Sequence, residues 1–261
     1  MRFLNISLCV LLLIVILIKK PPIKVETPTL PAPVTVTKTE LESTIDKINQ
    51  SKNLITTFSC NDLTIHLSGQ EIIKLKANIK YQKDKNFRMI INSILGKECD
   101  IGSNDSLFWF WSKRMEPKGL YYALNKDLAL TRLKAPFNPV FIRQSLGLDS
   151  IDPKQVTYGQ KNGNRYEIIL KQELAISRVL FINYTTLQID GQYLYEKNKL
   201  VASSEVTDRF PNGLPKTIII KWLPENLIMR LDFQSGDTNQ TLSAQNWQMP
   251  NISPKINMAY N

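Results

Sequence analysis

The stretch Asp100-Ile-Gly-Ser-Asn-Asp-Ser-Leu-Phe-Trp-Phe-Trp111 joins a polar turn to five consecutive large apolar residues, 107–111. A half-buried strand normally alternates apolar and polar side chains, because successive residues point to opposite faces of a sheet. Here both faces of the predicted strand are apolar and mostly aromatic. Such a strand must be covered on both sides or must face an apolar cavity or ligand.

Alternating patterns on either side of this stretch predict many more strands. Ile73, Leu75, Ala77, Ile79 and Tyr81 alternate with polar residues, as a half-buried strand does. After Pro153, eight further strands are predicted, near 155–160, 164–171, 178–184, 187–195, 199–207, 215–223, 226–234 and 241–247. No repeat with a period of about 20–50 residues is present, which argues against a solenoid or propeller. The sequence therefore predicts a mainly β (α+β) fold, with one large curved antiparallel sheet and two or three helices on one face.

Two segments favour helices. Thr39-Glu-Leu-Glu42 fits a capping box before apolar residues at helical spacing, which predicts a helix over 39–51. Pro139 is suited to begin a short helix that continues to Leu146 and ends at Gly147.

The N-terminus reads as a targeting segment followed by a spacer. Residues 4–18 are nearly all apolar, and no Ala-x-Ala-like cleavage site follows, so we favour a signal anchor over a cleaved signal peptide for 1–20. Residues 21–37 hold five prolines, typical of an extended linker. Residues 38–261 are then expected to form the folded domain.

Charge and residue chemistry exclude several classes of function. The net charge of +10 favours a solvated basic surface, with contact to an anionic membrane surface as the alternative. The scattered lysines carry no nucleic-acid signature, so no nucleic-acid partner is expected. The chain has one histidine, His66, and no nucleotide or hydrolase motif, so we expect no catalytic residue, no metal and no cofactor. Outside the N-terminal segment, Cys60 and Cys99 form an even pair, which permits one disulfide or two free core thiols. We expect the two cysteines to approach each other, as a disulfide requires.

The order of these elements resembles the LolA/LolB-like lipoprotein carriers and the related bacterial envelope lipoprotein-like family. The likeness covers roughly 38–250. It rests on Leu41 to Asn53 before Leu54-Ile-Thr-Thr-Phe58, on Lys85-Asn-Phe-Arg-Met89, on Asn104 to Trp111, on Pro136 to Leu146, and on the strands from Arg178 to Pro250. The carriers have an Arg-Pro pair near the place where this chain has Lys83-Asp84, and this chain lacks a lipobox.

The resemblance implies an unclosed half-barrel whose concave face holds lipid acyl chains. An N-terminal helix and one or two short helices would cover that face. The expected partners are a lipid or an acylated protein, the membrane through the N-terminal segment, and an envelope protein. The resemblance also implies that 38–261 lies on the periplasmic, extracytoplasmic side of the inner membrane, anchored by 4–18, or free in the periplasm if that segment is cleaved. The residues expected to bind lipid lie on strands by alternation, or on the short helix acting as a lid: Met89, Ile91, Trp109, Trp111, Tyr122, Val140 and Phe141.

Two alternatives remain open at this point. A scaffold module of the cell envelope would have a filled core and a protein partner at a sheet edge or on the basic outer face. An enzyme acting on an envelope polymer or lipid would need carboxylates clustered in a cleft, and the sequence shows none adjacent. Whether the concave side of the sheet is hollow is the observation that best separates these readings.

Overall fold

The computed structural model describes residues 36–68, 72–130, 138–162, 164–171 and 176–259. The expected signal anchor, 1–20, and residues 21–35 of the linker lie outside these ranges. Within them, no helix combines the length and the apolar character that crossing a membrane requires.

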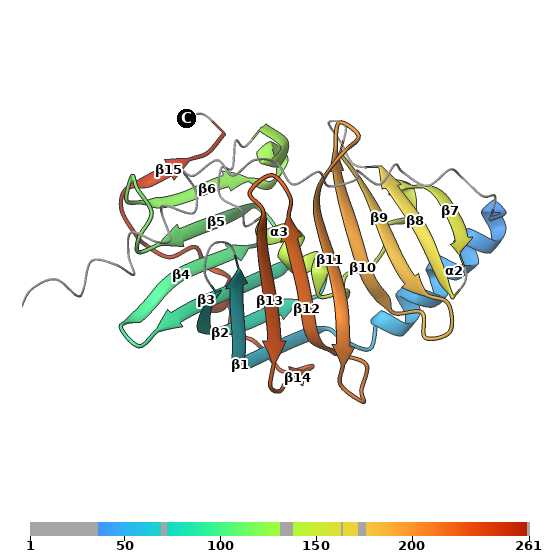
Figure 1. Cartoon of the computed structure of the whole chain (residues 1–261), viewed down its shortest axis with the longest axis horizontal. Coiled ribbons are helices and arrows are strands. Elements are labelled where there is room, and N and C mark those ends of the chain that lie inside the picture. Colours follow the sequence, from blue (N-terminus) through green and yellow to red (C-terminus); the bar gives the residue numbers. More distant parts are fainter. Residues whose placement is uncertain (1–35, 69–71, 131–137, 163, 172–175, 260–261) are drawn as a thin grey trace, which may run out of the picture.

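One sheet of fifteen strands makes up most of the molecule (Figure 1). The strands are β1 Thr57–Ser68, β2 Ile72–Gln82, β3 Asn86–Ser93, β4 Gly96–Ser103, β5 Leu107–Ser112, β6 Leu120–Leu124, β7 Val156–Asn162, β8 Arg165–Lys171, β9 Ile176–Asn183, β10 Ile189–Glu196, β11 Lys199–Arg209, β12 Pro215–Trp222, β13 Leu227–Phe233, β14 Asp237–Thr238 and β15 Lys255–Asn257.

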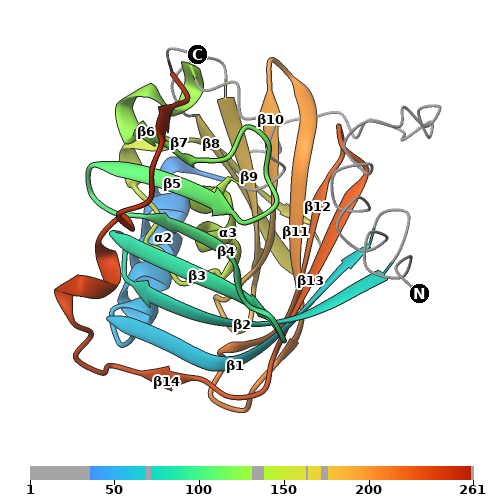
Figure 2. The same ribbon diagram turned by 90° about the vertical axis from the view of Figure 1, so that its left-hand side faces the viewer.

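The sheet curves but does not close. Its order is β15-β6-β5-β4-β3-β2-β1-β13-β12-β11-β10-β9-β8-β7, with β14 paired to β1. Neighbouring strands are antiparallel except β15 and β6. Because β7 and β15 stand at opposite ends of this order, the sheet is a half-barrel, and the predicted fold class is confirmed (Figure 2).

Helix α2, Lys38–Lys52, packs on one end of the sheet. The hydroxyl of Thr37 accepts a hydrogen bond from the Glu40 amide at 3.3 Å, so the helix cap lies two residues before the predicted one. The apolar face of α2 packs against β8 and β9 in a cluster that includes Leu41, Ile45, Ile48, Ile168 and Leu180.

Helix α3, Pro139–Ser145, lies in the concavity of the half-barrel (Figure 2). Its first turn is fixed by Asn138, whose side-chain oxygen accepts from the amides of Val140 and Phe141 at 2.9 and 3.2 Å. The helix ends before Gly147, which has φ +68°, a conformation that glycine adopts without strain. The predicted short helix is therefore confirmed.

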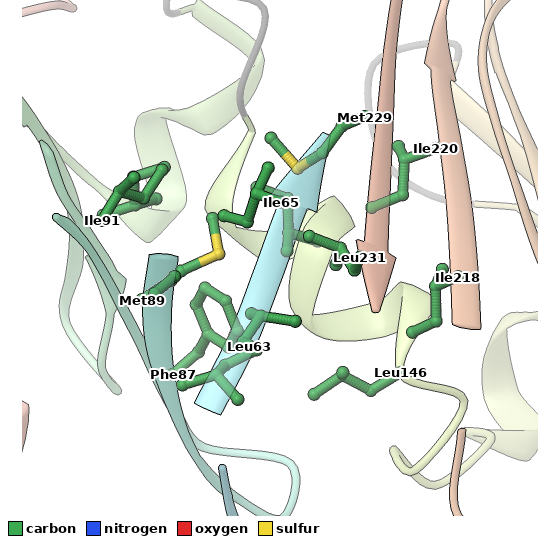
Figure 3. Packing of buried hydrophobic residues seen from close by; sticks show 14 of the residues in the cluster. Leu63, Ile65, Phe87, Met89, Ile91, Leu146, Ile218, Ile220, Met229 and Leu231 are labelled. Atoms are coloured by element: carbon green, nitrogen blue, oxygen red, sulfur yellow. The ribbon is translucent and has the colours of Figure 1, made fainter. Parts of the chain in front are cut away.

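The main core lies between the two halves of the curved sheet. It takes apolar residues from β1–β5 on one side, from β11–β13 on the other, and from α3 between them. Figure 3 shows Met89 and Leu63 from the first group converging with Ile218, Leu231 and Leu146.

Among the described residues, three short 3₁₀ helices occur: η1 Asn125–Leu130, η2 Pro153–Gln155 and η3 Ala244–Trp247. The strand predicted near 241–247 is wrong, because Ser243 caps η3 by accepting from the Gln245 amide at 3.3 Å. Serine favours such caps over extended pairing.

Candidate functional site

The register of β5 decides which of its aromatic rings faces the concave interior. Phe110 pairs with Ile101 on β4, and Ile101 pairs with Met89 on β3. All three residues belong to the main core, which α3 also contacts. Trp109 pairs with Gly102, which pairs with Arg88, so this row lies on the opposite face.

The prediction that Trp109, Trp111 and Tyr122 face the concave side is therefore wrong. Tyr122 pairs with Trp109 on the outer face, and Trp111 is two residues along from Trp109. The physical reason is a buried carboxylate: Asp100 pairs with Trp111 and accepts a hydrogen bond from Trp109 Nε1 at 3.2 Å.

The outer face of β3–β5 carries a charged cluster under the tryptophan. Asp100 accepts from Arg88 Nε at 3.0 Å and from Arg88 Nη2 at 2.8 Å, and Lys97 Nζ lies 3.0 Å from it. Burial raises the pKa of Asp100, but the hydrogen bonds and charge of Arg88 outweigh it, and the pKa lies below its usual range. A Cβ at Gly102 would lie 2.2 Å from the Trp109 ring, so only glycine leaves room for this packing.

The structure places Met89, Ile91 and Phe141 inside the concave core, as expected. Phe141 is 1% exposed, and its ring meets the Trp222 ring edge-on at 6.3 Å between centroids. Val140, next to it on α3, is only half buried. Helix α3 is thus more than a surface lid: its Phe141 and Ile142, with the C-cap residue Leu146, fill the apolar interior of the half-barrel.

A few polar contacts hold α3 in this position. Gln192 Nε2, on β10, lies 3.1 Å from Ser145 Oγ and 3.4 Å from the carbonyl of Phe141. At the end of the helix, the Lys52 ammonium donates to the carbonyl of Gly147. Burial lowers the pKa of Lys52 to about 7, so its charged and neutral forms coexist near neutral pH.

A pocket of about 490 Å³ lies beside the C-terminal half of α3. Its wall comes from α2, the turn between β2 and β3, α3, the segment 149–155 and strands β8–β10. The lining residues are Asn49, Asp84, Arg143, Gln144, Asp149, Ser150, Ile151, Asp152, Pro153, Gln155, Leu170, Arg178, Leu180 and Ile189. None of the residues expected to bind lipid lines it. One signal in the sequence could have indicated this pocket: Arg178 is a charged residue on the same strand face as the apolar Leu180 and Ile182.

The predicted approach of Cys60 and Cys99 is wrong, and both are free and buried. Cys60 lies on β1 and Cys99 on β4, with β2 and β3 between them. Three strand spacings amount to about 14 Å, far beyond the Cα separation of about 4.4–6.8 Å that a disulfide needs. Burial raises the pKa of both thiols, which makes them poor nucleophiles in the folded chain.

His66 contacts Asp232 at 3.2 Å on the outer face of β1 and β13. No group of three or more His, Cys, Asp or Glu side chains suited to a metal ion occurs among the described residues.

The turn between β3 and β4 exposes two large apolar side chains. Ile94 is 102% exposed and Leu95 71% exposed. Exposed lysines lie near the same ends of the neighbouring strands: Lys74 on β2, Lys97 on β4 and Lys113 just after β5. An apolar hairpin tip with a basic surround is a typical contact with an anionic membrane surface.

Comparison with known proteins places the fold. No protein-family model matches the chain, and no curated protein matches its sequence. Among solved structures, the chain is similar to a LolA superfamily protein from Nitrosomonas europaea, with 11% identity over 80% of this chain and 97% of that one, and a TM-score of 0.54.

Two further structures are similar. A DUF1329 family protein from Desulfovibrio piger has 10% identity over 79% of this chain and 96% of its own, with a TM-score of 0.56. A domain from Vibrio parahaemolyticus, described as an outer membrane lipoprotein-sorting protein, has 8% identity over 78% of this chain and 94% of its own, with a TM-score of 0.52. The resemblance to the LolA superfamily predicted from the sequence is thus present in the fold.

Proposed function

We propose that this chain is a non-enzymatic, extracytoplasmic carrier that binds the acyl chains of a lipid or lipoprotein in the concave interior of its half-barrel. The observation that carries the proposal is the position of α3. This seven-residue helix and its C-cap residue place Phe141, Ile142 and Leu146 on an apolar sheet face, where an acyl chain would otherwise lie. The LolA-like fold supports the same assignment.

The free energies of the exchange are compatible with this proposal. Re-exposing these three large apolar side chains costs about 1.5–3 kcal/mol each, or about 5–9 kcal/mol in total. Burying an acyl chain of about 16 carbons contributes about 0.8 kcal/mol per methylene, or about 12 kcal/mol. A long acyl chain can therefore displace α3, whereas a ligand with only a few methylenes cannot.

The test is the lipid content of the purified full-length protein. Native mass spectrometry and solvent extraction should detect a co-purifying amphiphile, and an environment-sensitive apolar dye should bind and be displaced by long-chain lipids. If no lipid co-purifies and no dye binds, the carrier function is wrong. That result would favour the scaffold alternative, which the packed interior of this structure also supports.

We further propose that the domain stays close to the membrane, held by residues 4–18 and touching the bilayer through the β3–β4 hairpin. The exposed Ile94 and Leu95 support the second contact. A probe at position 95 reports it in the full chain, because Cys60 and Cys99 are buried and only Cys9 needs replacement.

We expect a bimane or NBD label on Leu95→Cys, in a Cys9→Ser background, to shift to the blue in anionic proteoliposomes and to be quenched by lipid-borne quenchers. The matched control is Leu54→Cys, which is 75% exposed and lies near the start of β1, at the other end of these strands. Equal spectra from both positions would contradict insertion of the hairpin.

A further inference from the structure

Arg178 is a buried cation without an ionic partner. It is 8% exposed on the inward face of β9, and it donates from Nε and Nη2 to Gln192 Oε1 at 3.1 and 2.5 Å. In the described part of the chain no carboxylate forms an ion pair with it. Asp149 is the acid whose charge acts on Arg178. Its carboxylate already pairs with Arg143 at 3.0 Å and accepts a hydrogen bond from the Tyr81 hydroxyl at 2.9 Å. A buried charge is unfavourable unless an opposite charge compensates it.

The pocket beside α3 gives this guanidinium access to a ligand. Arg178 lines the pocket together with apolar Leu170, Leu180 and Ile189. Its volume, about 490 Å³, is within the range of about 300–1,000 Å³ usual for small-molecule sites.

The acidic residues of the wall are already engaged. Exposed Asp84 accepts from the Ser150 amide at 2.6 Å, and exposed Asp152 from the Lys154 amide at 3.0 Å. Both aspartates are exposed to solvent, whereas Arg178 is buried.

We propose that this pocket binds the carboxylate or phosphate head of a single-chain anionic amphiphile, with Arg178 as its charge partner and the leucines of β8 and β9 against its first methylenes. A guanidinium suits this role because it can form paired hydrogen bonds with either oxyanion. The inference rests on the proposed function and deepens it by naming the head group. The pocket adjoins Arg143 and Gln144 of α3, so the tail of a seated ligand would lead toward the interior that α3 fills.

The test compares two ligands that differ only in their head, dodecanoate and dodecanol, by calorimetry on the full-length protein. We expect dodecanoate to bind about tenfold more tightly or better, because a charge-assisted hydrogen bond is lost in the alcohol. Arg178→Gln should remove this preference while leaving dodecanol affinity within about twofold. Arg230→Gln, the same change on an arginine whose side chain is 53% exposed, should leave the preference intact.

The outcomes of this test distinguish the head-group site from the proposed lipid-binding function. Equal affinity of the wild-type protein for the two ligands overturns the head-group site but leaves apolar binding in place. Binding of neither ligand removes the proposed function as well. If inorganic phosphate, which has no apolar tail, competes with dodecanoate, the pocket is a site for free anions, and the proposal that it binds an amphiphile is wrong.

A second measurement does not depend on the folding of Arg178→Gln. With the wild-type protein and carboxyl-labelled dodecanoate, carbon NMR should show the bound carboxyl titrating at a lower pH than free dodecanoate, because a guanidinium favours the charged form. An unchanged or raised midpoint would place the carboxyl away from Arg178 and overturn the assignment.

Discussion

Asp100→Asn is expected to lower the free energy of unfolding by about 3–5 kcal/mol, because it removes the buried carboxylate that pairs with Arg88 and Lys97 and leaves the largely buried Arg88 against a neutral amide. Asp100 is 0% exposed and the Arg88 side chain 15% exposed. Urea denaturation at neutral pH measures the change. The matched control is Asp62→Asn, whose carboxylate pairs with Lys76 at 56% and 62% side-chain exposure; it should cost less than about 1 kcal/mol.

The same residue gives a pH dependence with a defined sign. The pKa of Asp100 is lowered in the folded chain, so its contribution is fully present above the unfolded pKa of about 3.9 and is lost as the pH falls through the folded value. The difference in stability between wild type and Asp100→Asn should therefore shrink in acid below about pH 4. A difference that is constant with pH would show that the carboxylate charge is not the cause.

Phe141→Ala is expected to have the second large effect. Truncating a buried phenylalanine costs about 3–5 kcal/mol of stability and leaves an apolar cavity next to Trp222. In the wild-type protein an acyl chain must displace this ring, whereas in the variant part of the site is already empty. Apolar ligands should therefore raise the melting temperature of Phe141→Ala by more than that of the wild type.

The control for this prediction is Phe108→Ala. Phe108 is also fully buried, but it belongs to a separate cluster with Ala123 and Met258. It should lose similar stability without gaining ligand response. Equal ligand-induced shifts of the melting temperature in both variants would mean that any cavity in this protein binds the ligand. The position of α3 would then not mark the acyl-chain site.

Much of the fold could be predicted because side chains along a β strand alternate between the two faces of the sheet, with a period of two residues. The alternation on β2, the Pro139 start and the Gly147 end of α3 are local signals, and each was sufficient. The stretch 107–111 is apolar at every position, so alternation alone does not say which face is inside. Asp100 indicates the answer. The turn near 104–106 pairs Asp100 with Trp111, so both side chains lie on the same face of the sheet. Because a carboxylate facing an apolar interior is unfavourable, that face is the outer one.

The candidate site was less accessible from sequence. The pocket joins the loop 149–155 to strands β8–β10 and to a turn near Asp84, segments far apart in the chain. Nothing local in any one of them indicates that they meet. The spacing of Cys60 and Cys99 likewise carried no information about the two strands between them.

The edge-on contact of Phe141 with Trp222 has a practical consequence. Indole fluorescence is sensitive to the polarity and packing around the ring, and Trp222 is one of four tryptophans in the chain. Trp109 and Trp111 stand on the outer face of the sheet, and Trp247 is in η3, so displacement of α3 alters the surroundings of Trp222 first. The protein thus contains its own optical reporter of an occupied interior, and a wild-type titration compared with Trp222→Phe would read it without any label.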